Sequence, residues 1–260
     1  MQAVDLIEIE GRQIEAERIP GASHDAPVLV FLHEGLGSAR MWREFPAELA
    51  SATGCAALTY SRYGNGGSEP LHEARPVSYM HDEALVVLPQ VFAAYGIVKP
   101  ILIGHSDGAS IALIYAGAHP AALRAAIVLA PHLFVEDISI RSIAAIRDTY
   151  ESTGLRSRLA RYHRDVDRTF YGWNRIWLDP AFRSWNIREF TRRIEAPVLA
   201  IAGENDEYGT LAQLEALRED ARGPVDCLAL ARCGHAPHRD RTELVTTAAA
   251  AFITSLSTQR

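Results

Sequence analysis

Cysteine is scarce in this chain: its 260 residues include three, Cys55, Cys227 and Cys233. The odd number and the absence of a Cys-x-x-Cys spacing argue against a disulfide framework and against a zinc site. We therefore expect reduced thiols, no metal ion and a cytoplasmic location.

Positive charge is not in excess, because 26 Lys and Arg residues stand against 32 Asp and Glu residues, for a net charge of −6. This balance argues against a nucleic-acid partner, whose phosphates need a basic face. The first residues, MQAVDLIEIEG, carry acids and lack the apolar core of a signal peptide, and no apolar run reaches the length that spans a bilayer. We expect neither nucleic acid nor a membrane as a partner.

A glycine-rich cofactor loop is also missing. Gly64-x-Gly66 lacks the G-x-G-x-x-G spacing of a dinucleotide site, and it does not follow the first strand of a strand–helix unit. We therefore expect no cofactor.

What the chain does contain is a series of short, nearly continuous apolar runs, typical of strands buried on both faces. They cover 28–33, 56–60, 101–105, 125–130, 198–203 and 226–231. Amphipathic stretches with helical spacing cover 41–52, 79–95, 107–119, 210–221 and 241–256. Residues 4–19 alternate apolar and polar side chains about Glu10–Gly11, which predicts an antiparallel hairpin. The predicted fold class is α/β, with a doubly wound, mostly parallel sheet.

Residues 135–192 break this rhythm, because they contain helical patterns and no strand-like run. We predict a helical cap there, inserted into a core domain made of 1–134 and 193–260. The insertion is rich in aromatic residues: Tyr162, Phe170, Tyr171, Trp173, Trp177, Phe182 and Trp185. Most should pack within the cap, and the remainder should face the pocket and favour an aromatic or planar apolar substrate. Six of its arginines should be mostly solvated, although one facing inward would clamp a carboxylate: Arg158, Arg161, Arg164, Arg168, Arg175 and Arg183.

The stretch ILIGHSDGASIAL, residues 101–113, places Ser106 where a predicted strand turns into a predicted helix. Gly104-His105-Ser106-Asp107-Gly108 fits the G-x-S-x-G pattern, whose glycines permit a tight, strained turn that exposes the serine at the sheet edge. The N–H of Asp107 would then face negative charge that develops on a substrate oxygen.

A serine hydroxyl needs a base, and the base needs a group to orient it. Asp206 follows the strand 198–203, and His235 follows the last strand, in the order Ser, acid, His. Glu204 and Glu207 are rival carboxylates and His238 is a rival base, all less well placed. We predict Ser106, Asp206 and His235 as the catalytic triad.

These motifs resemble the α/β-hydrolase fold superfamily, and within it a serine hydrolase with a helical cap. The resemblance extends from Val28 to the C-terminal helix, and FLHEGLGSARMW is similar to the family's His-Gly-x-x-Gly loop. That loop supplies the second donor of an oxyanion hole, which by position is the N–H of Gly35, beside that of Asp107. YSRYGNGGSEP resembles the family's Gly-x-Gly-x-Ser turn.

The sequence departs from the family pattern in four places. Glu34 replaces the usual glycine after His33, Asp107 replaces an apolar residue or Gln, and Ser61 and Tyr63 replace Asp and Arg. An acid beside an oxyanion hole would oppose charge stabilisation unless it points away or pairs. We expect the Glu34 and Asp107 side chains to point away from the hole.

The serine at position 106 excludes the haloalkane dehalogenases and epoxide hydrolases that the chain resembles, because they need a carboxylate there. Candidate pocket residues are Glu34, His132, Phe134, Trp173 and Trp177, with Leu133 beside them. The partner we expect is a small-molecule substrate. The oligomeric state stays open, with a homodimer among the candidates.

The first hypothesis is hydrolysis of a small carboxylic ester or lactone through an acyl-enzyme. The second is hydrolysis of a carbon–carbon bond in a ring-cleavage diketone, which needs further polar groups for ketonisation. The third is a non-catalytic receptor for a small molecule. A lyase or a cofactor-free perhydrolase also stays open with the same residues.

Overall fold

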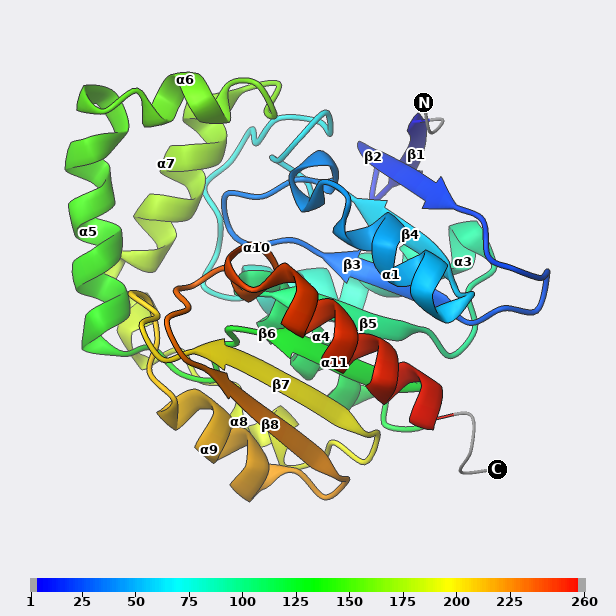
Figure 1. Ribbon diagram of the computed structural model, residues 1–260. Coiled ribbons are helices and arrows are strands. Elements are labelled where there is room, and N and C mark those ends of the chain that lie inside the picture. Colours follow the sequence, from blue (N-terminus) through cyan, green and yellow to red (C-terminus); the bar gives the residue numbers. More distant parts are fainter. Residues whose placement is uncertain (1–3, 257–260) are drawn as a thin grey trace.

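The computed structural model describes residues 4–256, shown in Figure 1. Within them, eight strands form one sheet in the order β1-β2-β4-β3-β5-β6-β7-β8. The central and C-terminal strands are β3 (Val28–Leu32), β4 (Ala56–Tyr60), β5 (Ile101–His105), β6 (Ala125–Leu129), β7 (Val198–Gly203) and β8 (Val225–Leu230). They pair in parallel throughout. The predicted fold class is confirmed.

The predicted hairpin is present at one edge of this sheet. β1 (Val4–Ile9) and β2 (Arg12–Ile19) are antiparallel about Glu10–Gly11, and β2 continues antiparallel along β4. The hairpin therefore extends the parallel sheet by two strands without a crossover helix.

Helices cover both faces of the sheet. α1 (Phe45–Thr53) and α11 (Thr242–Ser255) pack on one face, where they bury side chains such as Phe31 and Ile103. α3 (Leu88–Tyr95), α4 (Asp107–Ala118) and α9 (Ala212–Asp220) belong to the other face. The strands are apolar on both sides because both sides are covered. None of the helices in residues 4–256 combines the length and the apolarity needed to cross a bilayer.

The stretch predicted as one helix over 79–95 is divided. α2 (Tyr79–Asp82) is followed by a π-helical turn, Glu83–Val87, and then by α3. The cause is Pro89, which has no N–H and whose ring would collide with a carbonyl one turn earlier in a continuous α-helix. The predicted helix 41–52 similarly becomes a 3₁₀ turn, Ala39–Trp42, and α1, with the break at Arg43.

The segment between β6 and β7 is helical, as predicted for residues 135–192. It contains α5 (Asp137–Ser152), α6 (Leu155–Leu159), α7 (Val166–Trp177), a 3₁₀ turn (Pro180–Ser184) and α8 (Arg188–Thr191). In Figure 1, α5, α6 and α7 stand together beyond the end of the sheet, whereas α8 packs against α4 in the core. α7 begins where Asp165 accepts a hydrogen bond from the Arg168 N–H. The division into core domain and cap stays a prediction.

Candidate active site

Ser106 lies between the end of β5 and the start of α4, in a strained backbone conformation. Its φ is 53° and its ψ is −117°, values that a non-glycine residue rarely adopts. The turn also needs a close approach, because a Cβ on Gly108 would lie 1.9 Å from the Leu32 carbonyl oxygen. The predicted strand–turn–helix context is therefore present, and the turn brings the Ser106 side chain to the carboxyl end of the parallel strands.

His235 and Asp206 reach Ser106 from the loops that follow β8 and β7. The Ser106 Oγ lies 2.9 Å from His235 Nε2, and His235 Nδ1 lies 2.9 Å from both carboxylate oxygens of Asp206. The structure thus brings together, in one hydrogen-bonded chain, three side chains that are up to 129 positions apart in the sequence.

The rival residues lie elsewhere. Glu204 is exposed, and Glu207 accepts a hydrogen bond from the backbone N–H of His235, not from its ring. His238 is 3% exposed, and its ring centroid lies 4.9 Å from that of Trp42. None of these three residues is hydrogen-bonded to the imidazole nitrogens that face Ser106 and Asp206.

Asp206 is held as an ionised acceptor. Burial alone would raise its pKa, but the hydrogen bond and the charge of His235 outweigh burial and lower it. The backbone N–H groups of Tyr208 and Gly209 also donate to Asp206 Oδ1, at 2.8 and 3.2 Å. The carboxylate is therefore oriented independently of the imidazole, and it in turn fixes the His235 tautomer with the proton on Nδ1.

The residues of both predicted oxyanion donors line the pocket at Ser106. Asp107 is the first residue of α4, whose free N–H groups and dipole favour negative charge. Gly35 lies in the loop after β3, and a Cβ on it would lie 2.2 Å from the indole of Trp173. Only a residue without a side chain fits between this loop and α7.

The Glu34 side chain turns toward other loops. Its Oε2 lies 3.4 Å from His105 Nδ1, and its Oε1 lies 3.5 Å from an Arg239 nitrogen. Burial alone would raise the pKa of Glu34, but the nearby His105 and the charge of Arg239 hold it well below its usual range. His105 Nε2 in turn lies 2.7 Å from the His235 carbonyl oxygen, so Glu34 and His105 link the loop after β3 and the end of β5 to the loop after β8.

The expectation that the Asp107 side chain points away was wrong. One of its oxygens, Oδ2, would lie 3.1 Å from a Cβ on Gly35, and the residue lines the pocket at Ser106. The carboxylate is 1% exposed and accepts hydrogen bonds from the Tyr79 hydroxyl at 2.7 Å and from Trp177 Nε1 at 3.3 Å. The Asp107 carboxylate therefore stays beside the pocket as a hydrogen-bonded group. The sequence pattern did not indicate that Tyr79 and Trp177 would supply donors to it.

The pocket at Ser106 is small, with a volume of about 110 Å³, and largely apolar. Four of the five predicted pocket residues line it: Glu34, His132, Trp173 and Trp177. Phe134 does not, because its backbone forms a bridge with Asn186 at the base of the cap. Sequence reasoning missed three lining residues: Leu36, Ile143 and Tyr208. Leu36 directly follows Gly35 and Tyr208 lies two positions after Asp206, so their places in the sequence gave some signal, whereas Ile143 had none.

His132 presents a second imidazole to this pocket. Its ring centroid lies 5.7 Å from that of His235 and 5.1 Å from that of Trp177, and its Nδ1 has no hydrogen-bond partner. Burial, helped by the nearby His235, lowers the pKa of His132 to about 3. His132 is therefore a neutral imidazole at ordinary pH.

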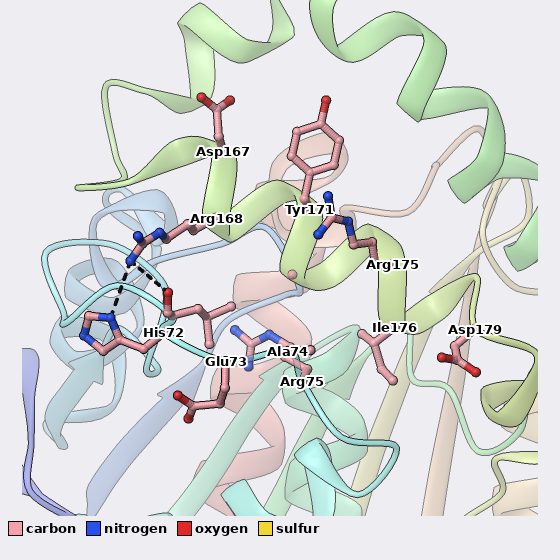
Figure 2. Close-up of a pocket in the computed structure, with 12 residues that line it drawn as sticks. His72, Glu73, Ala74, Arg75, Asp167, Arg168, Tyr171, Arg175, Ile176 and Asp179 are labelled. Atoms are coloured by element: carbon pink, nitrogen blue, oxygen red, sulfur yellow. Dashed lines mark hydrogen bonds between the residues drawn. The ribbon is translucent and has the colours of Figure 1, made fainter.

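A second, larger hollow of about 420 Å³ lies along other residues of α7, between this helix and the loop 71–76 (Figure 2). Two of the cap arginines face it, Arg168 and Arg175, together with Arg75. Arg168 contacts the Leu71 carbonyl and His72, as Figure 2 shows, and Arg175 lies over the Tyr171 ring. None of the arginines of this cleft lines the pocket at Ser106. Within residues 4–256, no group of three or more His, Cys, Asp or Glu side chains is arranged to hold a metal ion.

Comparison with known proteins agrees with this geometry. Residues 29–248 match the sequence model described as the alpha/beta hydrolase family. A 2-succinyl-6-hydroxy-2,4-cyclohexadiene-1-carboxylate synthase from Enterobacter sp. is 33% identical over 47% of this chain, but the alignment spans only 44% of that protein. The enzyme of the same name from Salmonella enteritidis is 26% identical over 83% of this chain and 78% of its own.

Solved structures show the same fold. The enol-lactonase from Burkholderia xenovorans LB400 superposes with a TM-score of 0.75, covers 96% of this chain and 100% of its own, and is 16% identical. The family match covers most of the chain, and the solved structure shares its fold. The chain therefore belongs to the alpha/beta hydrolase family.

Proposed function

We propose that the protein is a serine hydrolase that cleaves a small carboxylic ester or lactone. The single observation that carries the proposal is the unbroken hydrogen-bonded chain from Ser106 through His235 to Asp206, with the hydroxyl facing a pocket. Nothing else in the pocket has a nucleophile and a base in contact. Such a chain activates a hydroxyl toward a carbonyl carbon.

The reaction would proceed in two halves. His235 Nε2 accepts the Ser106 proton as Oγ attacks the carbonyl carbon, and the backbone N–H groups of Gly35 and Asp107 bind the oxyanion. The imidazolium then protonates the leaving oxygen, which departs and leaves an acyl-enzyme. Water, deprotonated by His235, attacks the ester carbon and regenerates Ser106. Asp206 stabilises the imidazolium in both halves.

The pocket supports a small, uncharged acyl group. Its volume of about 110 Å³ leaves room for a short chain or a compact ring beside Trp173 and Trp177. Its lining, all of which lies within residues 4–256, includes the carboxylates of Glu34 and Asp107 and no lysine or arginine. No cation in this lining would bind an anionic acyl group, so we do not transfer the carboxylate product named for the Enterobacter and Salmonella enzymes to this chain.

A second candidate function is hydrolysis of a carbon–carbon bond in a ring-cleavage diketone. The observation that favours it is His132, a neutral imidazole beside the triad with an unpartnered buried nitrogen. Ketonisation of such a substrate needs a polar group of this kind beyond the oxyanion hole.

The test is a substrate-class screen of the wild type beside Ser106→Ala. It covers short-chain and aryl esters, lactones and ring-fission diketones, with stoichiometric labelling by a fluorophosphonate as a second readout. We expect ester or lactone turnover and labelling of the wild type, and neither for the variant.

Other results would separate the alternatives. Turnover of diketones alone would favour the second candidate. Labelling at Ser106 without turnover of any substrate would favour a small-molecule receptor. A wild type that neither reacts with the fluorophosphonate nor turns over any substrate would refute the activation of Ser106.

A further inference from the structure

Arg62 is a buried guanidinium that touches the loop carrying one proposed oxyanion donor. It follows β4 and is 1% exposed. Its Nη2 donates to the carbonyl oxygen of Glu34 at 2.9 Å and to that of His33 at 3.2 Å. Arginine is seldom buried so fully without a structural or functional reason.

The contact with the Glu34 carbonyl bears on Gly35. The Glu34 carbonyl and the Gly35 N–H belong to one trans peptide group, so they point in opposite directions. Anchoring the oxygen on one side therefore aims the N–H toward the other. A hydrogen bond from a cation also polarises the peptide and makes its N–H a stronger donor.

His33 supports the same carbonyl. Its Nε2 accepts a hydrogen bond from the Arg62 backbone N–H at 3.0 Å, so the ring proton is on Nδ1, which lies 2.7 Å from the Glu34 oxygen. Burial and the charge of Arg62 lower the pKa of His33 well below its usual value, in keeping with this neutral tautomer. Two donors thus converge on one carbonyl.

The same guanidinium lies beside the second proposed donor. Its Nη2 is 3.8 Å from Oδ2 of Asp107, whose carboxylate is buried directly next to the oxyanion site. The other donors to that carboxylate, Tyr79 and Trp177, are neutral, and burial followed by the charge of Asp107 raises the pKa of Tyr79. Arg75 adds a second positive charge nearby, but among residues 4–256 only Arg62 lies within ion-pair distance of Asp107. Without Arg62, the carboxylate would oppose the negative charge of the transition state more strongly.

We propose that Arg62 is a positioning residue that sets both halves of the oxyanion hole: it aims the Gly35 N–H through the Glu34 carbonyl, and it balances the charge of Asp107. The inference rests on the proposed serine hydrolase. It also gives a reason for the acid that replaces the family's usual residue after the nucleophile, since Asp107 and Arg62 form a matched pair.

The test compares D107N with the double variant R62M/D107N, because removing both members of a buried ion pair costs far less stability than removing one. Glu83, a second buried acid that the Arg62 charge reaches, keeps its hydrogen bond from the Tyr60 hydroxyl and the charge of Arg75 in both variants. The primary readout is the second-order rate constant of fluorophosphonate labelling, which depends on the oxyanion hole and needs no identified substrate. We expect the double variant to react on the order of 10²-fold more slowly than D107N, the usual cost of one lost oxyanion donor. With p-nitrophenyl acetate, kcat should fall by a similar factor while KM stays near its D107N value.

The charge-balancing role is tested by R62M alone. It should react more slowly still than R62M/D107N, because it keeps the unbalanced carboxylate. R62K, which keeps the charge and one donor, should recover part of the loss. Equal rates for R62M and R62M/D107N, with both variants folded, would overturn this half of the proposal.

The matched control is a similar ion pair outside the pocket. Arg188 on α8 binds Asp220, which is 5% exposed, at 2.7 Å. R188M and R188M/D220N should change the melting temperature but keep the wild-type labelling rate.

Two further results would overturn the proposal: equal labelling rates for D107N and R62M/D107N, or a change confined to KM. Wild type that is labelled but turns over no ester would refute the proposed function, while the labelling rates would still decide the role of Arg62.

Discussion

The pocket at Ser106 and the cleft of Figure 2 lie along different residues of the same helix, α7, and differ in almost every property. Trp173 and Trp177 line the pocket of about 110 Å³, whereas Arg168 and Arg175 line the cleft of about 420 Å³. The cleft is larger and richer in charge. The pocket contains a hydroxyl in contact with a base.

Two carboxylates of the cleft are bound by arginines that lie outside its lining. Asp167 binds Arg156 through both oxygens, and Glu73 binds Arg12. These carboxylates also accept hydrogen bonds from tyrosine hydroxyls, but no serine–histidine contact lies beside them. The comparison teaches that neither the size nor the charge of a cavity identifies the candidate active site of this molecule. The site is identified by a nucleophile in contact with a base that an acid orients.

The comparison is tested most strongly by Asp206→Asn. The amide cannot hold His235 in the tautomer with the proton on Nδ1, so kcat for an ester should fall on the order of 10⁴-fold, as in trypsin-type triads. The matched control is Glu204→Gln in the same loop, which should keep wild-type kcat. Equal losses in the two variants would reassign the acid.

A second test adds one methyl group at the pocket and, in a separate variant, one at the cleft. Gly35→Ala would bring a Cβ to 2.2 Å from the Trp173 ring, and Gly172→Ala would bring one to 2.4 Å from Leu71 Cδ1 in the cleft. Only Gly35→Ala disturbs a proposed oxyanion donor, so its kcat/KM should fall on the order of 10²-fold.

Gly172→Ala crowds only the end of a flexible leucine, and kcat/KM should stay near the wild-type value. Melting temperatures of both variants separate a loss of fold from a loss of chemistry. A large loss of activity in Gly172→Ala would show that the cleft takes part in the reaction.

A third test uses the buried imidazole of the pocket. Burial lowers the pKa of His132 to about 3, whereas an unfolded chain binds the same proton near pH 6.5. The stability that His132 contributes is therefore complete above pH 6.5 and is lost as the pH falls toward 3, by about 2 kcal/mol at pH 5. Between pH 7.5 and pH 5, the free energy of unfolding should therefore fall by about 2 kcal/mol less in His132→Gln than in the wild type.

Urea unfolding at the two pH values measures this difference. His132→Phe also lacks a titrating ring and should give the same reduced pH dependence, whatever it does to stability at pH 7.5. If both variants keep the full wild-type dependence, the acid sensitivity comes from other groups.

The smallest effect is expected from the cleft itself. Arg175 lies over the Tyr171 ring and has no carboxylate partner among the ion pairs of residues 4–256. Arg175→Ala should therefore change kcat/KM for a neutral ester by no more than about two-fold, the usual range for a surface substitution. A loss of ten-fold or more would mean that substrate also contacts the cleft.

The strands could be predicted from the sequence nearly to the residue. The runs 56–60, 101–105 and 198–203 coincide with β4, β5 and β7, because a strand covered on both faces must be apolar at nearly every position. Helix 79–95 was less well predicted, since Pro89 could end, kink or widen the helix, and the packing around it selected a π-helical turn.

For the candidate site, the order Ser106, Asp206, His235 in loops after strands was enough to predict three side chains that the structure places in contact. The predictions failed where a position depends on several distant elements. Phe134 follows the same strand as His132 but is drawn into a bridge with Asn186, and Asp107 stays beside the pocket because Tyr79 and Trp177 bind it.

The sequence by itself determined the α/β fold and the three residues of the hydrogen-bonded chain, because both follow from local patterns: apolar runs that must be buried, and turns that end them. Only the tertiary structure decided that Arg62 reaches the Glu34 carbonyl, that Trp173 closes over Gly35 and that the cap arginines face a separate cleft. These contacts join segments far apart in the chain, and a side chain's neighbours across such distances depend on packing that no local pattern encodes.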